Sequence, residues 1–212
     1  MNYYFDDTEK ERISEARESF SGRLLTDPQF DEAIAITGII EREIHKSGSF
    51  KDALGDYAYA FARREKMDTA TAETRLRDLF AARTGQSMNQ MRGALQERED
   101  KLTPAQKKAA YDYALGVGDM IEKGNKINFN RAFAHQGQEL ARELGITDAG
   151  AKRLMKEEFK VAEGTEFYDW GKDLEGKYYR PQIEAEKQRS EERKQDGGRS
   201  RSNGRSRMRM QP

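Results

Sequence analysis

The sequence of 212 residues contains no cysteine, one tryptophan, two histidines and four prolines. Without cysteine the chain forms no disulfide bond and has no thiolate chemistry, which is compatible with an intracellular protein. The two histidines, His45 and His135, stand ninety positions apart, and neither belongs to a cluster with the spacing of metal ligands. We therefore expect no metal site and no cofactor.

Long apolar runs are missing as well. A membrane-spanning helix requires roughly 20 consecutive apolar residues, and no segment approaches that length. The polar, acidic N-terminus lacks the pattern of a secretory signal. The chain also lacks a Walker phosphate loop, and Gly116-Val117-Gly118 lacks the third glycine of a dinucleotide-binding motif. These absences predict a soluble, non-enzymatic protein that is not inserted in a membrane.

Charged residues are abundant, at 36% of the chain against 35% apolar residues, so the hydrophobic core must be modest. The charge is distributed unevenly. Residues 187–212 hold nine Lys and Arg against three Asp and Glu, so residues 1–186 carry a formal net charge of −6 although the whole chain is neutral. An acidic body with a basic end indicates a nucleic acid, a membrane surface or an acidic protein as partner.

The apolar residues recur at intervals of three and four, which predicts an all-α fold, a bundle of about eight or nine helices. The second helix, which begins at Asp27-Pro28, has the clearest buried stripe: Phe30, Ala33, Ile34, Thr37, Ile40 and Ile44. Side chains that cap helix N-termini are expected at other helix starts. They are Thr8 with Glu11, Ser49 with Asp52, Asp68 or Thr69, Thr103 with Gln106, Asn128 or Asn130, and Thr147 or Asp148.

A soft domain boundary is expected at Asp100-Lys101. It separates an N-terminal helical subdomain, 1–100, from a C-terminal helical subdomain, 101–195, which ends in a long charged helix kinked at Pro181. Residues 196–212 contain almost nothing apolar, and we expect them to form a disordered, arginine-rich tail.

Two apolar groups leave alternatives open. Met88, Met91 and Leu95 are expected to be buried either inside the protein or against a second copy, so the oligomeric state is not fixed. An aromatic group at the start of the last helix is expected to pack that helix onto the body, the alternative being stacking on nucleobases. Its members are Phe167, Tyr168, Trp170, Tyr178 and Tyr179.

Residues 137–156, GQELARELGITDAGAKRLMK, have the pattern of a helix-turn-helix. Ala141 is the small fifth residue and Gly145 the glycine of the turn, although Ala151 stands where such motifs usually have Val or Ile. If the hairpin binds the DNA major groove, its second helix supplies the contacts, above all through Lys152 and Arg153. The candidate DNA-binding residues are Thr147, Lys152, Arg153 and Lys156.

The alternative for this segment is a plain helical hairpin, because any helix that ends at glycine before a capped helix gives the same pattern. Acidic residues would also lie close to the path of the DNA phosphates and repel them. They are Glu139, Glu143, Asp148, Glu157 and Glu158.

The C-terminal segment ends in RSRSNGRSRMRMQP and has no acidic residue after Asp196. Arginine suits phosphate because its planar group donates two hydrogen bonds, so sequence-independent DNA binding is one interpretation. The others are an address recognised by a protein and a solvated end without a role. The arginines concerned are Arg199, Arg201, Arg205, Arg207 and Arg209.

This arrangement resembles the arginine-rich C-terminal translocation signals of substrates of Vir-type type IV secretion systems. Arg205, Arg207 and Arg209 match the alternating pattern, and Arg199 and Arg201 precede them at shorter spacing than that pattern usually has. The resemblance implies recognition by a secretion coupling protein and transfer out of the bacterium.

Residues 139–181 look like segments of proteins encoded by conjugative plasmids and integrative elements of alphaproteobacteria, which implies a mobile-element context and brings no catalytic residue. Together the two resemblances imply a non-enzymatic protein of the bacterial cytoplasm, recognised through its tail by a type IV secretion coupling protein or another protein partner. It would be a secretion substrate or accessory factor, transferred to a recipient or host cell. The alternative is a plasmid-encoded DNA-binding regulator or relaxosome accessory that uses the hairpin at 137–156. The acidic body favours an address over a DNA-binding tail because it would repel the same phosphates.

Overall fold

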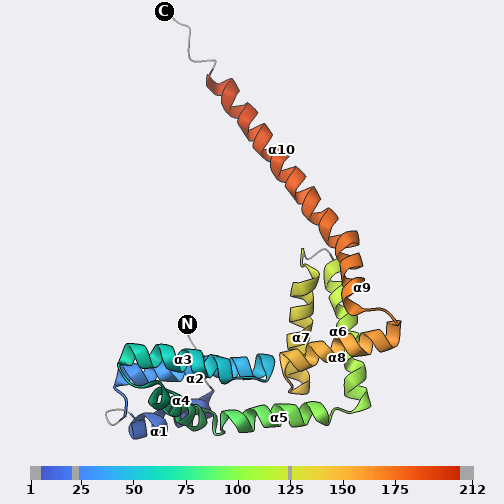
Figure 1. Cartoon of the computed structure of the whole chain (residues 1–212). Coiled ribbons are helices and arrows are strands. Elements are labelled where there is room, and N and C mark those ends of the chain that lie inside the picture. Colours follow the sequence, from blue (N-terminus) through green and yellow to red (C-terminus); the bar gives the residue numbers. More distant parts are fainter. Residues whose placement is uncertain (1–5, 21–23, 124–125, 206–212) are drawn as a thin grey trace, which may run out of the picture. The chain divides into compact units, whose positions relative to one another are not determined.

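The computed structural model describes residues 6–20, 24–123 and 126–205, with their side chains except at 192 and 194–205. These residues form helices joined by short turns, with no β-strand among them, which confirms the all-α fold (Figure 1). The chain divides into two compact units. The first comprises Met1–Lys107 and Gly137–Arg153, and the second comprises Lys108–Gln136 and Leu154–Pro212.

Helices α1 to α5 make up most of the first unit. Their bounds are α1 (Asp7–Phe20), α2 (Asp27–Ser47), α3 (Lys51–Glu65), α4 (Thr69–Thr84) and α5 (Met88–Asp100). The remaining helices belong wholly or partly to the second unit, and α6, α7 and α8 contribute residues to both units. Their bounds are α6 (Pro104–Glu122), α7 (Phe129–Leu144), α8 (Asp148–Glu163), α9 (Phe167–Leu174), the π-helical turn η1 (Glu175–Tyr179) and α10 (Arg180–Arg205).

The core of the first unit forms where α4 packs against α1, α2, α3 and α5. The predicted stripe of α2 is buried throughout, from Phe30 to Ile44, because its spacing places every member on one face of the helix. Met88, Met91 and Leu95 of α5 are buried within the chain itself, so a second copy is not needed to cover them.

Most of the predicted N-terminal caps are present. Asp68 accepts from the Thr71 amide at 2.8 Å, Asn128 from the Arg131 amide at 2.9 Å and Thr147 from the Gly150 amide at 2.9 Å, and Thr103 bonds reciprocally with Gln106. Two predictions were wrong. Asp6 instead of Thr8 caps α1, since its carboxylate accepts the Glu9 amide at 2.7 Å. Phe50 occupies the N-cap of α3 without a side-chain hydrogen bond, so Ser49 lies one residue too early.

Aromatic side chains fill the core of the second unit. The Phe167 ring lies 5.0 Å from Phe133, 5.1 Å from Phe159 and 5.2 Å from Phe129, measured between ring centroids. Trp170 lies 4.7 Å from Phe159. Contacts of this geometry stabilise a core beyond the burial of area alone. The prediction that the aromatic group packs α9 onto its neighbours is confirmed for Phe167 and Trp170.

The segments α9, η1 and α10 form one continuous helical run that changes direction between α9 and α10 (Figure 1). In η1 the Arg180 amide donates to the Glu175 carbonyl, five residues earlier. Pro181 follows at once, and proline in a helix has no amide to donate and crowds the carbonyl four residues before it. The sequence predicts a kink at Pro181, and a π-helical turn directly before the proline is one of the ordinary ways in which a helix accommodates such a break.

One boundary differs from that which the sequence predicts. The first unit continues past Asp100 to Lys107 and also includes residues 137–153, because Arg153 of α8 pairs with Glu99 of α5 and Arg98 of α5 donates to the Gly145 carbonyl in the turn. The backbone of α10 is described as far as Arg205. Residues 206–212 lie outside the described part of the chain.

Candidate functional site

The hairpin of α7 and α8 turns tightly at Gly145. This glycine has φ +65°, and the Ile146 amide donates to the Ala141 carbonyl at 3.1 Å across the turn. The helices also cross closely, since a Cβ atom at Gly137 would lie 2.7 Å from Cγ of Lys152. The connection therefore has the glycine-dependent geometry that the sequence pattern predicts.

The structure places the four candidate DNA-binding residues of the hairpin in contacts within the chain. Thr147 is buried and caps α8, and Arg153 forms an ion pair with Glu99 of α5. Lys152 is half-buried along Gly137, and Lys156 is half-buried with its Nζ 5.6 Å from the centroid of the Tyr168 ring. Each of these side chains already has a structural role, so a DNA-binding role would come in addition to it.

A groove of about 600 Å³ lies beside the turn, entirely within the first unit. Its rim carries five basic side chains, and all of them are exposed. These are Arg42, His45, Lys46, Arg98 and Arg142. They come from the ends of three helices, α2, α5 and α7, which the sequence separates widely. We refer to this site as the basic groove.

The helix ends explain in part why cations gather here. A helix C-terminus carries partial negative charge, and a cation in its last turn stabilises the helix by roughly 0.3–1 kcal/mol. His45 and Lys46 lie in the last turn of α2, Arg98 in that of α5 and Arg142 in that of α7. This effect accounts separately for His45, Lys46, Arg98 and Arg142 but not for Arg42, and it does not require that the three helix ends line one groove.

The floor of the basic groove is apolar. It consists of Leu95, Ala141 and Ile146, each less than 5% exposed. Two carboxylates also line the groove, Glu41 and Asp148. The groove thus combines an apolar floor with a rim that is mostly cationic, the combination that binds a ligand with both an apolar part and negative charge.

Several rim cations have partners of their own. Lys46 lies 3.2 Å from a carboxylate oxygen of Glu43, and Arg142 lies 2.8 Å from Glu139. Both pairs are three residues apart on an exposed helix surface, and such pairs are weak and exchange readily with water or another anion. The rim can therefore offer its charge to a ligand at little cost.

A buried arginine holds one wall of the groove. Arg83 of α4 is 2% exposed, donates to the Thr37 hydroxyl at 2.9 Å and pairs with Glu41 at 2.6 Å and with Glu9 of α1. Glu41 is thereby fixed by a charged partner inside the protein. Arg83 is not among the residues predicted from the sequence, although position 83 continues the buried stripe of α4 after Phe80.

His45 lies on the rim but lacks the surroundings of a catalytic imidazole. A general base is held in place by a hydrogen bond to its second nitrogen, and His45 has no hydrogen-bond or ion-pair partner among the described residues. His135 is an exposed residue of α7. Within the described ranges, no group of three or more His, Asp or Glu is arranged to hold a metal ion.

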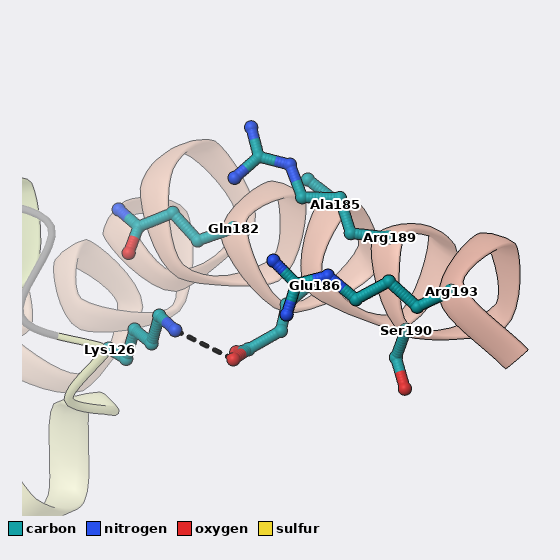
Figure 2. Close-up of a pocket in the computed structure, with 7 residues that line it drawn as sticks. All are labelled: Lys126, Gln182, Ala185, Glu186, Arg189, Ser190 and Arg193. Carbon is teal, nitrogen blue, oxygen red and sulfur yellow. Dashed lines mark hydrogen bonds and ion pairs between the residues drawn. The ribbon is translucent and has the colours of Figure 1, made fainter. Parts of the chain in front are cut away.

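A second hollow, of about 860 Å³, lies in the second unit between Lys126 and one face of α10. Lys126 reaches towards Glu186, with 2.8 Å between Nζ and Oε1, while Arg189 and Arg193 extend from the same helix (Figure 2). Its described lining consists of that single helix face and one lysine, so nothing encloses a ligand. We regard the first hollow, the basic groove, as the better candidate site.

The arginines of the predicted C-terminal address fall at the limit of the described chain. Arg199, Arg201 and Arg205 lie in the last turns of α10, where the backbone alone is described. Arg207 and Arg209 lie outside the described residues.

None of the described helices is both long and apolar enough to span a membrane. Comparisons with protein-family models, with curated protein sequences and with solved structures gave no match. The features from which a function can be argued are therefore the basic groove, the α7–α8 hairpin and the charged helix α10.

Proposed function

We propose that this is a non-enzymatic helical protein of a conjugation or type IV secretion context, recognised through Arg199, Arg201, Arg205, Arg207 and Arg209 as a secretion substrate or accessory factor. The recognising partner is a secretion coupling protein. The protein resides in the bacterial cytoplasm until it is transferred to a recipient or host cell.

The main observation in support of this proposal is the exposure of α10. From Glu184 onward every described side chain of the helix is exposed, and mean hydropathy along α10 is strongly negative, with no apolar face to pack. Most helical stability in proteins comes from packing of an apolar face, so a helix without one contributes little to the fold. A segment that does not serve the fold is available to an external partner.

The type of charge favours a protein partner over DNA. An acidic body repels the same phosphates that the basic end attracts, so a short arginine segment gives only weak, salt-sensitive DNA binding. Arginine also forms bidentate pairs with carboxylates, which suits recognition by an acidic protein surface.

A reporter fusion tests whether the address is sufficient. We expect a reporter protein that carries residues 187–212 at its C-terminus to be transferred to recipient cells through a Vir-type secretion system. The matched control carries the same segment with Arg205, Arg207 and Arg209 replaced by alanine, and we expect no transfer. A fusion that is never transferred, although an established substrate passes through the same system, would contradict the proposal.

A second candidate function is that of a plasmid-encoded DNA-binding regulator or relaxosome accessory. The tight turn at Gly145 and the close crossing at Gly137 favour it, because a helix-turn-helix needs both. In this function, the ion pair between Arg153 and Glu99 must break before Arg153 can contact a phosphate or a base.

The full chain with Lys152 and Lys156 both replaced by alanine tests this candidate. If the hairpin binds DNA, the double variant loses affinity for a preferred duplex in an electrophoretic shift assay, while Lys51→Ala with Lys107→Ala does not. Equal binding by the two double variants, or no sequence preference at moderate salt, shows that the hairpin is structural.

A further inference from the structure

We infer that the basic groove of the first unit is a docking site for an acidic amphipathic helix of a partner protein. The inference is independent of the C-terminal address, because the groove consists of residues from α2, α5, the end of α7 and the start of α8. It assigns a binding role to a surface that the sequence does not reveal, since the three contributing helix ends are far apart along the chain.

Charge complementarity points to an acidic occupant. The body of the protein is acidic overall, yet the rim gathers four Arg and Lys side chains and His45 against two carboxylates. One of these carboxylates, Glu41, shares the buried Arg83 with Glu9, so Arg83 offsets part of its negative charge. A cluster of positive charge on the surface of an otherwise acidic protein steers and orients a negatively charged partner.

The floor points to an occupant that has apolar side chains as well. Leu95, Ala141 and Ile146 form the apolar part of the lining, and arginine side chains like those of the rim can bury their aliphatic stems against a partner while the charged group stays in water. An amphipathic helix places residues at i, i+3, i+4 and i+7 in a groove of this kind and keeps its charged residues at the edges. The volume, about 600 Å³, falls within the range of ligand-binding pockets in proteins.

DNA fits the same groove less well. A duplex presents a continuous row of phosphates and no apolar side chain for the floor, so the apolar surface would stay unused. Asp148 at the start of α8 also lines the groove and would oppose a phosphate there. A peptide can place a neutral residue at that point, and a regular phosphate backbone cannot.

Fluorescence anisotropy with the full chain tests the inference. The probe is a labelled synthetic helical peptide with leucine at positions i, i+3, i+4 and i+7 and glutamate elsewhere, and a second probe is a labelled DNA duplex. The charge-reversal variant is Lys46→Glu with Arg142→Glu, two rim residues whose side chains are 66% and 72% exposed. The matched control is Lys51→Glu with Arg92→Glu, which makes the same charge change at exposed positions outside the groove.

We expect the peptide to bind the unmodified chain and to bind the charge-reversal variant about tenfold more weakly, because two attractive contacts become repulsive. The matched control is expected to retain its affinity. Both variants keep the arginine tail, so the comparison isolates the groove. A neutral version, Lys46→Gln with Arg142→Gln, should lose less affinity than the charge reversal and guards against a folding defect.

Three outcomes would overturn the inference. The first is that the peptide does not bind the unmodified chain. The second is that the charge-reversal variant and the matched control bind the peptide equally well. The third is that the duplex, but not the peptide, loses affinity on charge reversal, which would assign the groove to nucleic acid.

Discussion

Replacement of Arg83 by methionine is the sharpest test of how the first unit is held together. Arg83 is 2% exposed and connects α4 to Glu9 of α1 and to Glu41 and Thr37 of α2. Removing one partner of a buried ion pair costs about 3–5 kcal/mol, because it leaves an uncompensated charge. Here Glu9 and Glu41 are 21% and 28% exposed and can recover part of their hydration. We therefore expect the low end of that range, about 3 kcal/mol.

The assay is urea and thermal unfolding followed by far-UV circular dichroism, with hydrogen exchange to localise the effect. A loss of about 3 kcal/mol corresponds to a fall in Tm of roughly 10 °C for a unit of this size. The amides of α1, α2 and α4 should lose protection first, because these are the helices that Arg83 connects.

Two further variants separate charge from packing. Arg77→Met removes an arginine of the same helix, but one whose side chain is 43% exposed and pairs with Glu73 on the surface, so we expect a change of at most about 0.5 kcal/mol. Combining Arg83→Met with Glu9→Gln and Glu41→Gln should restore part of the lost stability, because no unpaired carboxylate remains. The reasoning fails if Arg83→Met is no more destabilising than Arg77→Met, or if the triple variant is no more stable than the single one.

Three other predictions concern single positions. Gly118→Ala should destabilise the second unit by about 1–3 kcal/mol and alter the fluorescence of Trp170, because the added Cβ atom would lie 2.9 Å from the indole ring. Gly93→Ala should instead stabilise its helix by about 0.5–1 kcal/mol, because no atom lies within 4 Å of the added Cβ atom. Asp68→Ala should destabilise the protein at neutral pH, because hydrogen bonds from Thr71 hold the pKa of this carboxyl below its ordinary value of 3.8. Because the pKa of Asp68 is lower in the folded than in the unfolded protein, its ionised carboxylate stabilises the fold at pH values above the unfolded-state pKa of about 3.8. The difference in urea midpoint between wild type and Asp68→Ala should therefore shrink as the pH falls below about 3.8 and disappear below the folded-state pKa.

Rules that involve only neighbouring residues predict much of the fold. The periodic stripe of α2 and the glycines that end α2, α4 and α7 depend only on residues within a few positions of each other, so the sequence determines them. The missed caps show the limit of the same rules. At the start of α1, Asp6 and Thr8 both satisfy the local preference for a cap, and only the observed hydrogen bond decides between them.

The basic groove could not be predicted in this way. Its rim depends on three helix ends meeting, and no local pattern states which helix ends are neighbours in space. Arg98 and Arg142 each have an ordinary explanation as a cation in a last helical turn. Only the packing of the turn at Gly145 against α5, which includes a 3.4 Å contact from Arg98 to the Gly145 carbonyl, brings them to one site.

The position of Pro181 shows an intermediate case. The sequence indicates a disturbance of the last helix at this residue, because proline removes one backbone hydrogen bond. It does not indicate where the helix adjusts, and the structure places the adjustment in η1, one turn earlier. The local rule therefore gives the cause but not the location of the irregularity.

The most direct test of the proposed address is transfer of the full chain through a Vir-type secretion system. The variant replaces Arg205, Arg207 and Arg209 by alanine, and the matched control replaces Arg180, Arg189 and Arg193, three arginines of α10 that precede the address. The account predicts that transfer of the first variant falls to background at unchanged expression, while the control is transferred like the wild type. Wild-type transfer of the first variant would contradict it.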